Sequence, residues 1–272
     1  MGYIPKKVKF IIDKHIEMIE ERLPDLLEGY YIYGSLSLGK FHYGFSDIDF
    51  IAVVNREVSE EELEVLKYIH NSINKKYRKT TLDGMYVMEE DIESLNKEGD
   101  RCIRFNDGKF EGYIKFNRNS IDAYQLKKCG IVIKGKDIED YKLEVNFDIL
   151  INEMRNNLNS YWVNWMNGCK KFMSSKYIGS FVSLKNIEWG VLGVSRLYYT
   201  LNEKDITSKV GAGEYALSKV PAKWHNIIKE SMKLRKDSKE SYYKSFSKRR
   251  DDALEYMDYI IKESNRLLDG KK

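Results

Sequence analysis

The chain has 272 residues, and its 42% hydrophobic and 13% aromatic content is that of one large or two modest folded domains. Its 46 basic and 42 acidic residues leave a net charge of +4, which is too small to indicate a nucleic-acid-binding groove. No run of apolar residues approaches the roughly 18 that cross a membrane, and the N-terminal segment is charged throughout, unlike a secretory signal.

The cysteines and histidines argue against two further classes of protein. Cys102, Cys129 and Cys169 are far apart and form no CxxC pair, as expected of reduced thiols in a cytoplasm. The four histidines show no zinc-binding spacing. We therefore expect a cytoplasmic protein, monomeric by default, with no membrane or nucleic-acid partner.

The first 145 residues alternate between helical and strand-like patterns. Apolar periodicity predicts helices over 6–22, after Ser59 and over 120–130, and strands over 29–35, 46–54, 80–88 and 131–135. Ser59 and Glu62 form a capping-box pattern, which predicts the start of the second helix. Such alternation predicts an N-terminal domain of helices and strands over 1–145.

The second half of the chain has a different pattern. Helical periodicity covers residues 148–172, 181–201, 214–219, 222–235 and 250–268. No convincing strand pattern follows Ile133. We therefore expect an all-helical domain, a helical bundle, over 146–272.

Two carboxylates lie one residue apart within the strand-like run SDIDFIAVV (46–54). Side chains alternate along a strand, so Asp47 and Asp49 point to one face. Paired oxygen ligands in this geometry suit Mg²⁺, which takes its remaining ligands from water and phosphates. The alternative is a solvent-facing sheet edge, and for an isolated DxD that alternative is the better interpretation.

Other residues around the DxD favour a phosphate site. Gly34 permits close approach of the backbone to a ligand, and Ser35 lies where a short helix would begin. Ser46 adds a hydroxyl next to the DxD, and Asp83 adds a third carboxylate on the strand 80–88. Asp83 could accept a proton from an attacking hydroxyl or complete the metal site. Taken singly, the glycine, the serines and Asp83 are also ordinary turn residues.

Together, these motifs resemble the nucleotidyltransferase superfamily that includes DNA polymerase β. The stretch YGSLSLGKFHYGFSDIDFIAVV (33–54) is similar to the nucleotide-binding signature of aminoglycoside adenylyltransferases of the streptomycin/spectinomycin type. IEWGVLGVSRLYYTL (187–201), ITSKVGAGEYAL (206–217) and VPAKWHNIIKESMKLR (220–235) resemble the C-terminal domain of that family. The implied fold is α+β: a polymerase-β-like domain with a mixed sheet, followed by an all-α helical bundle.

The resemblance implies ATP-dependent transfer of AMP to a hydroxyl of an antibiotic, with release of pyrophosphate. It implies that Asp47 and Asp49 bind Mg²⁺, as two ions, and that Ser35 and Ser46 contact the triphosphate. Asp83 would be the catalytic base, at a position where the family usually has glutamate.

The resemblance also implies roles for residues of the helical half. Arg196 and Lys209 would bind phosphates across an interdomain cleft. If the resemblance is set aside, the sequence favours Arg196 as an ion-pair partner of Glu188 on the same helix, and Lys209 as a solvated loop lysine.

The acceptor is a cation, so its pocket should be acidic and partly aromatic. Glu188 and Trp189 are the candidates, against the alternative of a surface charge and a core tryptophan. Asn186 lies where enzymes acting on both antibiotics have aspartate, and the segment 105–113 lacks their tryptophan. Both departures favour spectinomycin over streptomycin.

Two other functions remain open at this stage. The same fold could act on a protein, a tRNA end or another metabolite. It could also be a non-catalytic nucleotide-binding module, although all three acidic residues are present.

Overall fold

We describe the protein from a computed structural model, which covers residues 4–93, 101–236, 238 and 240–270. The chain divides into two compact units, Met1–Asn146 and Phe147–Lys272. None of the helices within these described residues is long and apolar enough to cross a membrane.

The first unit is built on one mixed sheet with the strand order β5-β4-β3-β2-β1-β6. Its strands are β1 (Leu27–Ile32), β2 (Ile48–Val54), β3 (Leu82–Met88), β4 (Cys102–Asn106), β5 (Lys109–Ile114) and β6 (Ile131–Lys134). The central strands β2 and β3 are parallel, and every other neighbouring pair is antiparallel. The predicted mixed sheet is confirmed, although β4 and β5 were not predicted.

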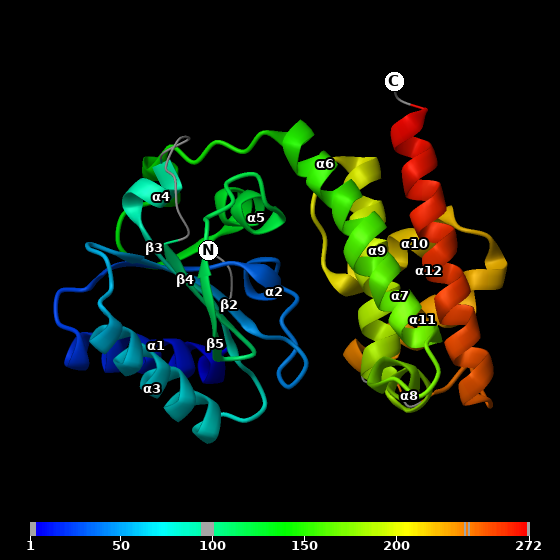
Figure 1. Cartoon of the computed structure of the whole chain (residues 1–272), viewed down its shortest axis with the longest axis horizontal. Helices are drawn as coiled ribbons and strands as arrows, with labels where there is room; N and C mark the ends of the chain where they lie inside the picture. Colours follow the sequence, from blue (N-terminus) through cyan, green and yellow to red (C-terminus); the bar gives the residue numbers. More distant parts are fainter. Residues whose placement is uncertain (1–3, 94–100, 237, 239, 271–272) are drawn as a thin grey trace. The chain divides into compact units, whose positions relative to one another are not determined.

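Helices cover both faces of this sheet (Figure 1). They are α1 (Lys6–Arg22), the short α2 (Gly34–Ser37), α3 (Glu60–Lys76), α4 (Glu89–Glu93), α5 (Ile121–Cys129) and the 3-10 turn η1 (Ile138–Tyr141). The buried faces of α1 and α3 share one apolar core with alternate residues of the strands, including Phe50 and Leu82. The opposite face of the sheet, including Ile51, packs against α4, α5 and η1. The two faces follow from the alternation of side chains along each strand.

In the second unit, the described residues form helices and the loops that connect them, without a strand. Its elements are α6 (Phe147–Asn157), the π-helical turn η2 (Leu158–Trp162), α7 (Val163–Lys170), α8 (Ser175–Val182), α9 (Leu184–Glu203), α10 (Lys209–Lys219), η3 (Ala222–Trp224), α11 (His225–Met232), η4 (Lys233–Arg235) and α12 (Phe246–Asp269). The long helix α9 contacts α8, α10, α11 and α12, and ten of its residues are buried. The predicted helical C-terminal region is confirmed.

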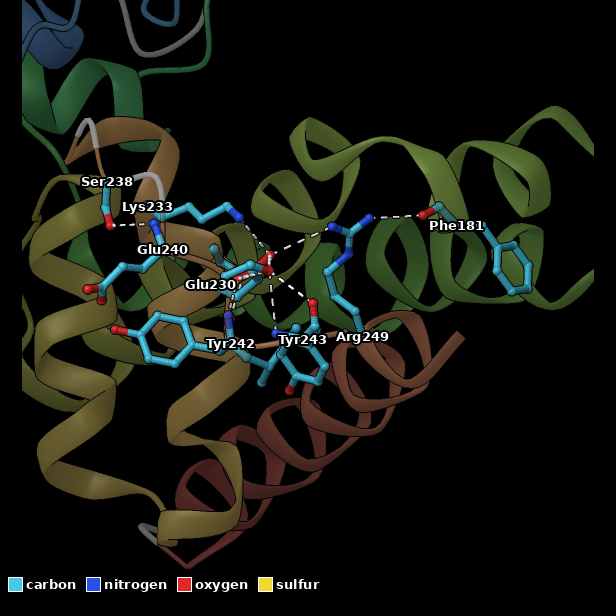
Figure 2. A network of polar contacts seen from close by, with 11 residues as sticks. Phe181, Glu230, Lys233, Ser238, Glu240, Tyr242, Tyr243 and Arg249 are labelled. Atoms are coloured by element: carbon cyan, nitrogen blue, oxygen red, sulfur yellow. Dashed lines mark hydrogen bonds and ion pairs between the residues drawn. The ribbon is translucent and has the colours of Figure 1, made fainter. Parts of the chain in front are cut away.

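A buried ionic network joins several segments of this second unit (Figure 2). The Glu230 side chain is fully buried and lies 3.1 Å from Lys233 and 3.6 Å from Arg249. It also accepts a hydrogen bond from the backbone N–H of Tyr242, and Arg249 donates to the carbonyl of Phe181. Because a buried carboxylate needs cations and donors, Glu230 fixes the end of α11 against α12 and the chain that precedes it.

Candidate active site

Asp49 and Asp83 lie directly opposite each other on the parallel strands β2 and β3. Their neighbours Phe50 and Leu82 enter the core on the α1 and α3 side, so both carboxylates face the other side. Asp47 precedes β2 and is exposed. Asp49 and Asp83 therefore lie on one face of the sheet, as the alternation of side chains predicts, and Asp47 lies just before the start of β2.

Gly34 is packed against the carboxylate of Asp49. A Cβ atom at this position would lie 1.7 Å from Asp49 Oδ2, and φ of Gly34 is +69°. The Gly34 carbonyl accepts hydrogen bonds from Gln125 Nε2 at 2.8 Å and from Ser37 Oγ at 3.0 Å. Both the space and the left-handed backbone conformation require glycine here, and Gln125 holds the turn in place.

The other two carboxylates are each oriented by a hydrogen-bond donor. Thr81 Oγ1 donates to Asp47 Oδ1 at 3.0 Å, and the backbone N–H of Gly108 donates to Asp83 Oδ1 at 3.2 Å. Partial burial, followed by the nearby charge of Asp47, raises the pKa of Asp83 to about 6. A carboxyl group with this pKa is suited to accept a proton near neutral pH.

The two predicted phosphate-binding serines differ in their surroundings. Ser35 Oγ, in the first turn of α2, is buried and has no hydrogen-bond partner among the described residues. An orphaned buried hydroxyl is costly, so a ligand oxygen that paired with it would be favoured. Ser46 is also buried, but its Oγ accepts a hydrogen bond from the His42 backbone N–H at 3.1 Å, which braces the turn before β2.

The carboxylate oxygens at the start of β2 and β3 are of a kind that can bind magnesium. Within the described residues, no three His, Cys, Asp or Glu side chains are grouped closely enough to hold a metal as they stand. The structure therefore does not gather Asp47, Asp49 and Asp83 into one three-carboxylate group. Magnesium, however, is usually held by one or two carboxylates together with water and phosphate oxygens. Asp47 and Asp49, one residue apart at the start of β2, meet that requirement.

In the second unit, Glu188 is at the centre of a cationic cluster. Its side chain is 1% exposed, and its Oε1 accepts a 2.6 Å hydrogen bond from Arg235 Nε and lies 3.3 Å from Lys209 Nζ. Burial, opposed by the charge of Glu188 and reinforced by Arg235 and Arg196, lowers the pKa of Lys209 to about 8. Glu188 is thus not the surface charge considered from the sequence, since it is buried against Lys209 and Arg235.

Of the other two acceptor candidates, Trp189 lies beside this cluster, and Asn186 lies against α8. The ring of Trp189 is exposed, lies 4.8 Å from Lys209 Nζ and bonds to Tyr161 through its N–H, so it is not a core tryptophan. Asn186, in the first turn of α9, is partly exposed, and a Cβ at Gly179 would clash with its amide.

A cavity of about 260 Å³ in the first unit lies away from the carboxylates. It is lined by Val54 and Met88, the last residues of β2 and β3, together with Arg56 and Arg101. Asp49 and Asp83 are near the opposite ends of these two strands, so the cavity is not part of this site.

Four residues that contact the carboxylate site or Glu188 were not predicted from the sequence: Thr81, Gly108, Gln125 and Arg235. The run Asn106-Asp107-Gly108 is a hairpin-turn signal that could have revealed both β4 and β5 and the donor to Asp83. Nothing in the sequence pairs Gln125 with Gly34, or Arg235 with Glu188, because 91 and 47 positions separate the partners.

Comparisons with known proteins agree with this arrangement. The family of nucleotidyltransferase domains matches residues 12–97, which include the three carboxylates. The family described as aminoglycoside adenylyltransferase, C-terminal domain, matches residues 181–263, which include the cluster around Glu188.

One solved structure is similar over nearly the whole chain. It is spectinomycin adenyltransferase AAD(9) from Enterococcus faecialis with ATP and spectinomycin, with a TM-score of 0.70 and 17% sequence identity. The likeness covers 95% of this chain and 98% of that one and shows a shared fold. No curated protein sequence matches the chain.

Proposed function

The chain is a nucleotidyltransferase of the aminoglycoside adenylyltransferase type, and from that premise we propose that it transfers AMP from ATP to a hydroxyl group of an aminoglycoside or aminocyclitol antibiotic. Spectinomycin is the favoured acceptor. Modification of this kind would confer resistance to the antibiotic. The two family matches make the chain a transferase, which argues against a non-catalytic module.

The observation that carries the proposal is the placement of Asp83 opposite Asp49. In the proposed reaction, Asp83 accepts the proton of the acceptor hydroxyl while the hydroxyl oxygen attacks the α-phosphorus of ATP. A new P–O bond forms, the bond from the α-phosphorus to the bridging oxygen breaks, and pyrophosphate leaves with that oxygen. The pKa of Asp83, about 6, is suited to this role near neutral pH.

Binding residues complete the proposed site. Asp47 and Asp49 would hold Mg²⁺, which supplies charge stabilisation at the transferred phosphoryl group when it is bound. Ser35 would donate its hydroxyl, which has no partner among the described residues, to a phosphate oxygen, while Gly34 leaves room for the Asp49 carboxylate. Ser46 would also contact the triphosphate. Arg196 and Lys209 would bind phosphate oxygens, and Trp189 and Asn186 would contact the acceptor.

The choice of spectinomycin rests on two supports. Asn186 replaces the aspartate that the sequence resemblance associates with streptomycin. The solved structure with the same fold is described as a spectinomycin enzyme bound to ATP and spectinomycin. Glu188 contributes less to this choice than the sequence suggested, because its charge is already matched by Lys209 and Arg235.

A pyrophosphate-release assay tests the proposal. Purified protein with ATP and Mg²⁺ should release pyrophosphate when spectinomycin is added, and less or none with streptomycin. Asp83→Ala should abolish the release with spectinomycin. If no antibiotic of a broad panel supports release, the antibiotic assignment is wrong, and labelled AMP found on a polypeptide or RNA would identify the alternative acceptor.

A further inference from the structure

A single carboxylate oxygen in the second unit is shared by two cations from different elements. Glu188 Oε1, on α9, is 2.6 Å from Arg235 Nε of η4 and 3.3 Å from Lys209 Nζ of α10. One cation would be enough to neutralise this buried carboxylate. The second cation therefore needs its own explanation.

The two cations differ in how firmly they are held. The Arg235 side chain is 10% exposed and makes the shorter contact, while Lys209 is 18% exposed and more distant. Lys209 is also the first residue of α10, where the positive end of the helix dipole opposes a cation. Its pKa is lowered to about 8, first by burial. Lys209 is thus the cation that can be released more easily.

The charged groups that face Lys209 come from each element around it. Glu188 and Arg196 lie on α9, and Arg235 lies on η4. On α10 itself, Glu214 forms an exposed ion pair with Lys236. Among the described residues, the groups that act on the pKa of Lys209 are therefore one carboxylate and two guanidinium groups.

The short turn η4, which carries Arg235, is also held at its first residue. η4 is only Lys233–Arg235, and Lys233 forms an ion pair with the fully buried Glu230 (Figure 2). Ser241 and the Tyr242 backbone donate further hydrogen bonds to Glu230. The turn that carries Arg235 is therefore held by two buried carboxylates, one at each end.

We propose that Glu188 and Arg235 are positioning residues that hold Lys209 ready for an anionic oxygen of the nucleotide. When Lys209 turns to that oxygen, Arg235 still compensates the charge of Glu188. Without Arg235, release of Lys209 would deprive the buried carboxylate of both cations that lie within 3.3 Å of it, which is strongly unfavourable. This inference rests on the proposed use of ATP, and it assigns Glu188 to the nucleotide rather than to the acceptor.

The test measures the affinity of the full chain for ATP with Mg²⁺, without any acceptor, at pH 6.5 and 8.5. Arg235→Met should weaken binding by about 30-fold or more at both pH values, because Lys209 stays with Glu188. Arg235→Lys should bind within a few-fold of wild type. The matched control Arg266→Met removes an arginine that is 78% exposed on α12 and should change nothing.

The variant Glu188→Gln tests whether Glu188 positions Lys209 or only supports the fold. Glu188 raises the pKa of Lys209, so its removal should lower that pKa further. The variant should keep its affinity at pH 6.5 and lose more affinity than wild type between pH 6.5 and 8.5. An equal loss at both pH values would mean that Glu188 only supports the fold.

Chemical labelling of Lys209 in the wild-type chain does not depend on any variant folding. The reaction of its amine with acetic anhydride should rise with a midpoint near pH 8, and ATP should protect it. Labelling that ATP leaves unchanged, or unaltered ATP affinity in Arg235→Met, overturns this inference alone. Absence of any ATP binding by the wild type overturns it together with the proposed function.

Discussion

Asp49 and Asp83 are direct register partners on the parallel strands β2 and β3, and their side chains lie on the same face of the sheet. The pKa of Asp83 is raised first by burial and then by the charge of Asp47, so keeping Asp83 ionised here costs stability in the free protein. Such local costs are typical of functional sites.

The first prediction concerns Asp49, the proposed magnesium ligand. Asp49→Asn keeps the shape of the side chain but removes its charge, so the rate of AMP transfer should fall by about a thousandfold or more. Pyrophosphate release measures the rate, and far-UV circular dichroism should show an unchanged fold. Asp258→Asn, on the exposed surface of α12, is the matched control and should keep full activity. Normal activity in Asp49→Asn would remove the argument for a metal here.

The second prediction compares two glycines that share the same left-handed backbone. Gly34 and Gly39 have φ of +69° and +64°, but a Cβ would clash with Asp49 only at Gly34 and would meet nothing within 4 Å at Gly39. Both Gly→Ala changes should therefore cost about 1 kcal/mol of stability from backbone strain. Only Gly34→Ala should also displace Asp49 and abolish activity. Equal activity of the two variants would show that the close approach at Gly34 has no role.

The third prediction concerns the pH dependence that Asp83 adds to stability. Its pKa in the folded state, about 6, is above the ordinary value of 3.8, so the protonated form is the one that folding favours. The stability that comes from this group is complete below about pH 4 and is lost as the pH rises through about 6. At pH 7, the free energy of unfolding of Asp83→Asn should therefore exceed that of wild type by about 1–3 kcal/mol, although the variant is inactive. It should unfold at a higher urea concentration.

The difference between Asp83→Asn and wild type should vanish at pH 4. Urea unfolding in the presence of a chelator, followed by far-UV circular dichroism, measures it at both pH values. If the variant is less stable than wild type at pH 7, Asp83 is a stabilising residue rather than a strained one.

Most of the fold could be predicted from periodicity and capping. The capping box of Ser59 and Glu62 is present as predicted, and α1 spans the predicted residues. Strand β5 was missed because its residues alternate between exposed and half-buried and include Gly112, which gives a weak apolar signal. The sequence pattern of an edge strand is weak for this reason, and the turn at Asp107-Gly108 was the better indicator.

The candidate site was less predictable than the fold. Alternation along strands was enough to place Asp49 and Asp83 on one face of the sheet. The ion pairs of Glu188 could not be predicted from periodicity, because Glu188 lies on α9 and its partners lie on α10 and η4. A local pattern reports neighbours along one helix, whereas the charge state of a buried residue depends on contacts between distant segments.

The fourth prediction concerns two histidines in the core of the first unit. His15 Nδ1 is 2.9 Å from the Tyr30 hydroxyl, and the Tyr86 hydroxyl is 3.1 Å from His15 Nε2 and 3.0 Å from His70 Nε2. Burial lowers the pKa of His15 to about 3, and burial, followed by the charge of His15, lowers the pKa of His70 well below 6.5. Both side chains are therefore neutral in the folded protein at neutral pH.

Because both folded-state pKa values are depressed, the stability they contribute is complete above about pH 6.5 and is lost as the pH falls. Below that value the unfolded chain binds up to two more protons, so stability should fall by about 2.7 kcal/mol per pH unit. His70→Phe, which keeps the stacking on Phe105, should reduce this slope to about half. His225→Gln, in the second unit, is the control and should leave the slope unchanged.

The measurement must follow the first unit alone. All four tryptophans lie in the second unit, so tryptophan fluorescence would report the wrong part of the chain. Hydrogen exchange of the amides of β1, β2 and β3 between pH 7 and 5 gives the free energy of opening of the sheet in which Tyr30 and Tyr86 lie. A pH-independent free energy over this range would show that the histidines become protonated without opening the core, and that Tyr30 and Tyr86 accept hydrogen bonds from the charged rings.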